Sequence, residues 1–332
     1  MVLTLPDTSP PVAERIHRSA SVSAKAGFHQ LSFQAMNTLC RVHFSCANAG
    51  AAKDYQAQVL AWVAWFESRY SRFLPESLVS RINAAAGEHW VEVDPETDAI
   101  LNLCQEMIFF TSGTFDPTSL PLIRLWNWKA TPPVIPNDSA IAEARELCGW
   151  RRIQRRKGAI FLPRKGMCLD LGGVGKEYAV DRVMTFALDR GINNVLVDFG
   201  QDVRVNGEPP ERGAWHIGLQ DPTSPDRCWT GVAAKQNAVA TSGDYLRYFT
   251  IDGRRYGHIL DPRSGQPVDN GTVSVSVIAP NCTLAGILST SVFILGLKAG
   301  MDLLSACPGV EGAITTRNSR HLTRGFYQYA TS

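Results

Sequence analysis

Residues 170–176 read Asp-Leu-Gly-Gly-Val-Gly-Lys and form the densest group of chemically useful residues in the sequence. We expect Asp170 to lie at the end of a strand and Lys176 to begin a helix. The three glycines between them let the backbone approach a ligand closely. Unpaired N–H groups and the helix dipole make such a turn a natural phosphate site. The spacing matches neither a Walker A motif nor GxGxxG, so those nucleotide folds are not supported. A tightly packed strand-to-helix turn without a ligand explains the residues equally well.

A second group joins residues 241–245 (Thr-Ser-Gly-Asp-Tyr) to residues 256–265, which contain His258 three positions before Asp261. An imidazole there could act as a general base or contact a phosphate. The alternative is a strand histidine that is satisfied by a neighbouring group.

A third group places Phe115 and Asp116 ahead of the tryptophans at 126 and 128. These residues could hold an aromatic cofactor ring, or they could form an Asx-Pro turn capped by core tryptophans. The small residues at 285–290 indicate a helix start with close packing, and by themselves nothing more.

The apolar periodicity predicts the elements that must position these groups. Strands are expected at 31–33 and 40–44, helices at 52–70 and 94–111, and a basic strand pair at 153–162, most simply a solvated hairpin. A helix should follow the turn at residues 172–175, here called the glycine turn, and end at Gly191. Further strands are expected at 194–198, 203–205, 215–219, 232–240, 246–251 and 273–279, before a last helix near Thr283. Clustered strands with few helices between them favour an α+β fold with mixed or antiparallel sheets and flanking helices.

Composition narrows the class of protein. The 332 residues carry 33 Lys plus Arg and 31 Asp plus Glu, a net charge of +2 with no basic block, so we expect no nucleic-acid partner.

No apolar run approaches the roughly 18–20 residues that span a bilayer. Residues 1–29 are expected to be a mobile arm without the apolar core of a signal peptide, and residues 30–330 a folded domain. Eight dispersed cysteines indicate reduced thiols. We expect a cytoplasmic location, or a periplasmic one if an export signal was trimmed.

Taken together and in this order, the motifs resemble the ApbE family, the FAD:protein FMN transferases, over roughly residues 30–330. The resemblance is carried by the segments 35–38, 73–77, 115–118, 170–176, 241–244, 258–265 and 273–296. It implies an α+β, T-fold-like domain of two intertwined subdomains with FAD held between them. It also implies Mg²⁺-assisted cleavage of FAD, transfer of FMN to a Ser or Thr of an acceptor flavoprotein, and release of AMP.

The resemblance also implies roles for individual residues, with His258 as the catalytic acid–base group. It assigns eight residues to cofactor binding: Met36, Phe73, Phe115, Asp116, Asp170, Lys176, Gly257 and His258. It assigns two residues to the metal, the backbone carbonyl of Gly173 and the side chain of Thr290.

The sequence departs from the family pattern at the metal. Gly286 stands where the family usually has an Asp that binds Mg²⁺, and Glu177 stands where it usually has glycine. Losing a carboxylate weakens an oxygen-ligand site, because Mg²⁺ depends on such charge. Asp202 could substitute for the missing carboxylate, and restoring Asp at 286 is expected to raise Mg²⁺-dependent cleavage. Two hypotheses follow: an active transferase with rearranged metal binding, or a catalytically impaired homologue that carries flavin or assists assembly. A structural homologue with an empty pocket is the third option.

Overall fold

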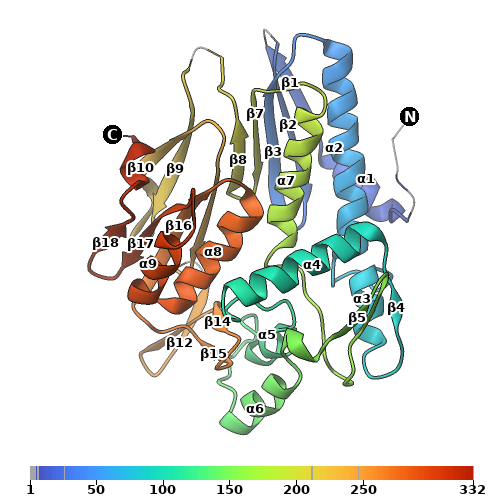
Figure 1. The fold of residues 1–332 in the computed structure, drawn as a ribbon, viewed down its shortest axis with the longest axis vertical. Coiled ribbons are helices and arrows are strands. Elements are labelled where there is room, and N and C mark those ends of the chain that lie inside the picture. The colour runs from blue at the N-terminus through green and yellow to red at the C-terminus, as the bar shows by residue number, and fades with distance from the viewer. Residues whose placement is uncertain (1–4, 6, 26, 211, 246, 332) are drawn as a thin grey trace.

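The computed structural model describes residues 5, 7–25, 27–210, 212–245 and 247–331. Its centre is a nine-stranded sheet in the order β1-β2-β3-β7-β8-β11-β16-β17-β18, in which every neighbouring pair is antiparallel (Figure 1). The strands are β1 (Ser21–Lys25), β2 (Phe28–Ala35), β3 (Thr38–Ser45), β7 (Val195–Phe199), β8 (Asp202–Asn206), β11 (Ala238–Gly243), β16 (Thr272–Ala279), β17 (Glu311–Thr316) and β18 (Arg320–Leu322).

Long helices cover one face of this sheet (Figure 1). They are α2 (Ala49–Tyr70), α7 (Gly175–Leu188) and α8 (Cys282–Leu295), with α1 (Pro10–Ser19) and α9 (Leu297–Ser305) beside them. Side chains alternate across a strand, so every second residue of the sheet faces these helices. Ala238 and Ala240 of β11 accordingly lie in the main core with α7 and α8.

A second sheet packs on the opposite face of the first. It contains β9 (Trp215–Asp221), β10 (Ser224–Ala234) and β19 (Ala330–Thr331). The intervening residue Val239 points to this side, where it joins Trp215 and Val232 in a separate core. The strand alternation of β11 therefore divides the hydrophobic interior into two layers.

A smaller lobe lies at one end of the helical layer (Figure 1). It contains α3 (Leu78–Ala84), α4 (Pro95–Phe110), α5 (Leu120–Trp126), α6 (Asp138–Glu146), and a sheet of β4 (Val91–Glu92), β6 (Ala159–Phe161) and β5 (Gln154–Arg156). Short hairpins β12 (Tyr248–Ile251) with β13 (Arg254–Gly257) and β14 (Leu260–Asp261) with β15 (Gln266–Pro267) lie against it, and 3₁₀ turns occupy Trp150–Arg152 and Phe326–Gln328. Leu260 packs with Leu122 of α5 and Ile141 of α6 in a third core.

The α+β class with antiparallel sheets and flanking helices is confirmed, and the structure corrects several local expectations. Asp170 is not delivered by a strand, because residues 168–174 are irregular and turn directly into α7. The run 232–240 is two strands in different sheets, since the polar residues 235–237 interrupt it. The helix near Thr283 is not the last one, because Gly296, with φ of 77°, ends α8 and lets α9 begin. Of the strand expected at 246–251, residues 248–251 form β12, and Leu246 lies outside the described residues.

Part of the expected mobile arm is packed against the domain. Residues 10–19 form α1, which buries Val12, Ala13 and Ile16 in the main core, and residues 21–25 form β1 at the edge of the sheet. The expectation therefore does not hold for this segment: three apolar residues at helical spacing give it a face to bury. Residues 1–4, 6 and 26 lie outside the described part of the chain.

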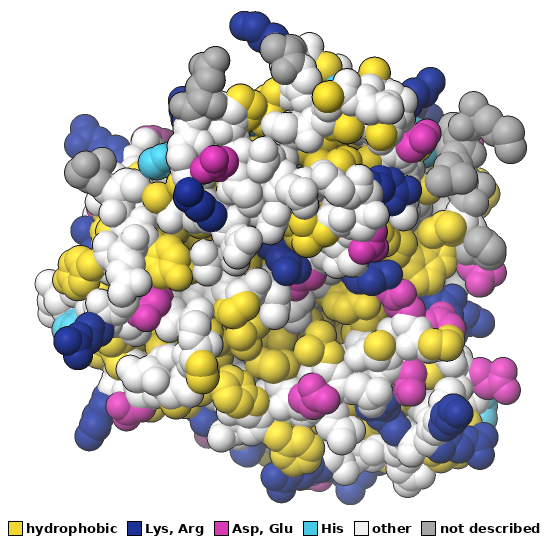
Figure 2. Space-filling model, turned by 45° about the horizontal axis from the view of Figure 1, so that its top comes forward, with side chains coloured by type: hydrophobic (Ala, Val, Ile, Leu, Met, Phe, Trp, Pro, Cys, Tyr) yellow, Lys and Arg dark blue, Asp and Glu magenta, His cyan; other side chains and the backbone are white. Residues whose placement is uncertain are grey.

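Surface and sequence features agree on a mixed charge distribution. On the face shown in Figure 2, Lys and Arg side chains are interspersed with Asp and Glu side chains. Among the described residues, no helix combines the length and the apolarity needed to cross a membrane. All eight cysteines fall within the described residues and are free thiols.

Asp181 of α7 fixes the position of α8. Its carboxylate accepts hydrogen bonds from the backbone N–H groups of Cys282 and Thr283 (2.9 Å each), and from the Thr283 hydroxyl (2.6 Å). It also pairs with Arg204 of β8 at 2.9 Å. Since the first N–H groups of a helix have no partner within the helix, this carboxylate satisfies two of them and opposes the positive end of the helix dipole.

Replacing Asp181 by Ala should lower the free energy of unfolding by about 2–4 kcal/mol, because it removes four hydrogen bonds and leaves Arg204 without this ion-pair partner. Urea unfolding monitored by circular dichroism measures the change. Asp54→Ala, at an exposed position of α2, is the control and should shift the value by less than about 0.5 kcal/mol. Equal stability of the two variants would contradict the role assigned to Asp181.

Candidate functional site

A cavity of about 800 Å³ opens where the three cores meet. Ligand pockets span roughly 300–1,000 Å³, so this one suits a large small-molecule ligand. It is lined by seven of the residues to which the sequence assigns site roles: Phe115, Asp116, Asp170, Gly173, Lys176, His258 and Thr290. These residues come from segments as far apart as 115 and 290, and the fold brings them together.

Asp170 holds the glycine turn in place. Its N–H donates to the Pro117 carbonyl (2.7 Å), and its Oδ1 accepts from the Gly172 N–H (2.9 Å). Its Oδ2 pairs with Nε of Arg72 at 3.0 Å. The Asp170 carboxylate thus lines the cavity and also stabilises the turn that forms part of its wall.

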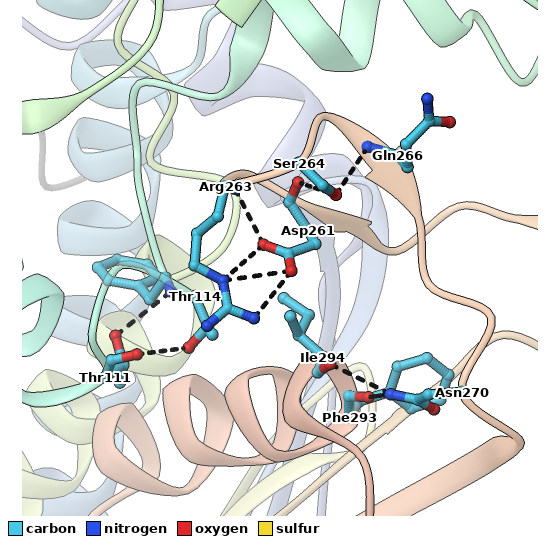
Figure 3. A network of polar contacts seen from close by, with 10 residues as sticks. Thr111, Thr114, Asp261, Arg263, Ser264, Gln266, Asn270, Phe293 and Ile294 are labelled. Atoms are coloured by element: carbon cyan, nitrogen blue, oxygen red, sulfur yellow. Dashed lines mark hydrogen bonds and ion pairs between the residues drawn. The ribbon is translucent and has the colours of Figure 1, made fainter. Parts of the chain in front are cut away.

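Phe115 and Asp116 follow a tight turn after α4. The Thr114 hydroxyl donates to the Thr111 carbonyl at 2.9 Å, and the Thr111 hydroxyl accepts from the Phe115 N–H at 3.3 Å (Figure 3). The Phe115 ring is buried and lies beside Gly173, where an added Cβ would be 3.8 Å from the ring. Phe115 therefore forms an aromatic wall against the glycine turn.

Both oxygens of the Asp116 carboxylate are engaged. Oδ1 accepts from the Thr118 N–H and hydroxyl (2.8 and 2.6 Å), and Oδ2 accepts from the Trp150 N–H (3.2 Å). This is the geometry of an Asx-Pro turn, one of the two alternatives that the sequence allows for this segment; the other is ligand binding. Asp116 lines the cavity while it ties the turn to the 3₁₀ segment at 150.

Three expected cofactor residues do not line the cavity. Phe73 is 74% exposed, and the guanidinium of Arg72, the partner of Asp170, lies 4.2 Å from its ring centroid. The Met36 N–H donates to Glu67 at 2.9 Å in the turn between β2 and β3. Gly257 packs against Asp244, where an added Cβ would lie 2.7 Å from a carboxylate oxygen.

Lys176 and two carboxylates form a buried charged group. The ammonium of Lys176 pairs with Asp202 of β8 and lies 3.8 Å from Oε1 of Glu177. Both carboxylate residues are buried, and both line the cavity. One ammonium faces two carboxylates, so this part of the wall carries a net negative charge. It is not a simple cationic phosphate site.

Three hydroxyl groups cluster where β11 meets α8. The Ser242 hydroxyl lies 2.8 Å from that of Ser289 and 2.9 Å from that of Thr290, and the Ser289 hydroxyl donates to the Gly286 carbonyl at 2.9 Å. Ser242 and Thr290 line the cavity, so their hydroxyls give it uncharged oxygen atoms that could bind a ligand or a metal ion. Among the described residues, no three His, Cys, Asp or Glu side chains gather as a metal-binding cluster.

The imidazole of His258 lines the cavity. Its ring Nδ1 lies 3.1 Å from the Arg247 carbonyl, which can only accept, so Nδ1 carries the hydrogen and Nε2 keeps a free lone pair. Burial lowers the pKa of the imidazole below its ordinary value of 6.5, and this effect exceeds that of the hydrogen bond, which raises the pKa. The neutral, proton-accepting form therefore prevails at neutral pH.

The loop after His258 is held by an internal ion pair and by contacts to α5 and α8. Arg263 donates to the Asp261 carboxylate through Nε (2.9 Å) and a terminal nitrogen (2.8 Å), and the Trp126 indole donates to the Gly265 carbonyl (2.9 Å). Further along, the Asn270 amide donates to the Phe293 and Ile294 carbonyls at the end of α8 (Figure 3). These contacts hold the His258 segment between the small lobe and α8.

The sequence reasoning missed some of the cavity wall. The β9–β10 hairpin contributes Gly218, Gln220 and Cys228, and the Gln220 side chain accepts from the Tyr245 hydroxyl at 2.7 Å. No motif marks this hairpin, because its position follows from the second sheet packing on the first. The Thr-Ser-Gly-Asp-Tyr segment could have indicated Ser242 and Tyr245.

A neighbouring cavity of about 880 Å³ lies beyond Asp116 and includes arginines at 145, 151, 152 and 263. Two arginines in and just before the basic strand pair have partners in the fold. Arg152 donates to carbonyls at the end of α6, and Arg155 pairs with Asp98 at 2.7 Å. We place the candidate site in the first cavity, because the glycine turn and His258 lie there.

Comparison with known proteins connects this geometry to a family. The family model described as "ApbE family" matches residues 36–314. An FAD:protein FMN transferase of Treponema pallidum is 31% identical over 301 residues, covering 83% of this chain and 81% of that protein. One from Klebsiella pneumoniae is 32% identical over 246 residues, 73% of this chain and 76% of its own length. The crystal structure of an ApbE protein from Thermotoga maritima superposes with a TM-score of 0.83 at 30% identity, covering 92% of this chain and all of that one.

Proposed function

The chain belongs to the ApbE family, and from that premise we propose that it is an FAD:protein FMN transferase. It binds FAD in the 800 Å³ cavity and moves FMN through a phosphoester bond onto a Ser or Thr hydroxyl of an acceptor flavoprotein. The observation that supports this most directly is that His258, the glycine turn with Lys176, Phe115 and Thr290 line one cavity.

His258 performs the proton transfer in this proposal. Its free Nε2 accepts the proton of the acceptor hydroxyl while that oxygen attacks the FMN-side phosphorus. The bond from this phosphorus to the bridging oxygen breaks, and AMP leaves with that oxygen. Phe115 and the glycine turn orient the ligand, and burial keeps His258 neutral so that it is ready to accept a proton.

The cavity also has donors suited to Mg²⁺. The Gly173 carbonyl and the Thr290 hydroxyl are the hard oxygens that would hold it, and Mg²⁺ commonly adds one or two carboxylates and substrate phosphates. When bound, the ion neutralises charge on the diphosphate. A buried carboxylate oxygen, Oε2 of Glu177, accepts no hydrogen bond from the described residues, which fits a cation at this wall.

A second candidate is a catalytically impaired homologue that binds FAD as a carrier or assembly protein. The observation that favours it is Gly286, which brings no carboxylate to the wall from α8.

Direct assay separates the two candidates. Incubating the chain with FAD and an acceptor flavoprotein, with and without Mg²⁺, should release AMP and give a covalent FMN adduct by mass spectrometry only with the metal. The acceptor with its target Ser or Thr changed to Ala is the control. Tight FAD binding with neither product would establish the second candidate instead.

The rate of FMN transfer should fall as the pH decreases through a midpoint below 6.5, because protonation removes the base and the pKa of His258 is lowered. His258→Gln should reduce the rate about 10²–10⁴-fold and abolish this acid limb while FAD still binds. Single-turnover rates across pH 5–8 measure both effects.

His89→Gln, at an exposed position away from the cavity, is the matched control and should retain the wild-type profile. An unchanged acid limb in His258→Gln would show that another group supplies the base.

A further inference from the structure

Glu177 and Gly286 share one space between α7 and α8. A Cβ added to Gly286 would lie 2.5 Å from Cγ of Glu177 and 3.1 Å from its Oε1. Contacts that close to a side-chain carbon are not tolerated, so any side chain at 286 would displace Glu177. The glycine on α8 therefore makes room for a carboxylate that arrives from α7.

The packing of the two helices brings this carboxylate to the cavity that Gly173 and Thr290 also line. Asp181 meets Cys282 and Thr283, and Glu177, four residues earlier on α7, meets Gly286, four residues later on α8. Residues four apart lie on one helix face. Thr290 lies one turn beyond Gly286 on α8, Gly173 lies in the turn just before α7, and both line the cavity with Glu177.

The charge on Glu177 is poorly balanced within the protein. The residue is 8% exposed, and its Oε2 is buried without a hydrogen-bond partner among the described residues. The nearest cation, Lys176, is 3.8 Å from Oε1 and also pairs with Asp202. A buried carboxylate without full compensation is costly, and a bound cation removes that cost.

We propose that Glu177 supplies, from α7, the carboxylate ligand that the family resemblance places at position 286 of α8. With the Gly173 carbonyl and the Thr290 hydroxyl it forms a site for a divalent cation that takes oxygen ligands. The inference rests on the proposed function for the identity of the cation. Asp202 is the weaker substitute, because Lys176 pairs directly with its carboxylate.

This arrangement revises the expectation that restoring Asp at 286 raises activity. In Gly286→Asp the new side chain collides with Glu177, so the variant should bind the cation no better than the wild type. The exchange Glu177→Gly with Gly286→Asp removes the collision and returns the carboxylate to α8.

Mn²⁺, an oxygen-seeking probe, tests the site without catalysis. Loss of free Mn²⁺ signal in electron paramagnetic resonance gives the affinity of the full chain with FAD present. Glu177→Gln should weaken binding about tenfold or more, the double exchange should recover wild-type affinity within about threefold, and Glu177→Gly alone should stay weak. Glu88→Gln, at an exposed position outside the cavity, is the matched control and should bind normally.

Unchanged Mn²⁺ affinity in Glu177→Gln, no measurable binding by the wild type, or a folded double exchange that stays weak would each overturn the assignment. Circular dichroism and urea midpoints establish folding, and equilibrium dialysis with FAD establishes ligand binding. If Glu177 governs Mn²⁺ affinity but no FMN is transferred, the metal site holds and the proposed function fails. If FMN is transferred and Mn²⁺ affinity ignores Glu177, only this inference fails.

Discussion

The interaction on which the site depends is the carboxylate of Asp181 at the N-terminus of α8. It binds two backbone N–H groups and a hydroxyl of α8 while Arg204 of β8 holds it from the other side. One side chain thus fixes the register of α7 against α8 and of both against the sheet. Since the glycine turn begins α7 and Thr290 lies on α8, the spacing across the cavity follows from this cap. Asn270 secures the other end of α8, so the helix cannot slide along its partner.

The cavity exists because three hydrophobic cores meet without merging. The main core orders α2, α7 and α8, the second orders the β9–β10 hairpin, and the third holds α5, α6 and Leu260. Each core contributes to the lining: Phe115 comes from the main core, Val239 from the second and Leu260 from the third. His258 lies two residues before Leu260, so the packing of the small lobe sets the position of its imidazole. A site built in this way is largely preformed, which lowers the entropic cost of ordering it when a ligand binds.

The sequence predicted what local residue patterns encode. Apolar periodicity located α2 and α4, and the clustered residue types identified the glycine turn and the segments of Phe115 and His258. It failed where distant packing decides: an apolar run such as 232–240 does not show that its halves enter different sheets. The absent carboxylate at Gly286 was visible in the sequence. Its relation to Glu177 was not, because only the fold brings positions so far apart into one space.

Electrostatics explains why a carboxylate can be carried by α7 as well as by α8. Glu177 lies in the first turn of α7, where the helix dipole and unpaired N–H groups favour negative charge. Its extra methylene, compared with Asp, lets it reach across to α8, and the missing Cβ of Gly286 leaves the path open. Two side chains cannot occupy that gap, and two carboxylates there would repel each other. The positions therefore act as one unit, with a carboxylate on one helix requiring the smallest residue on the other.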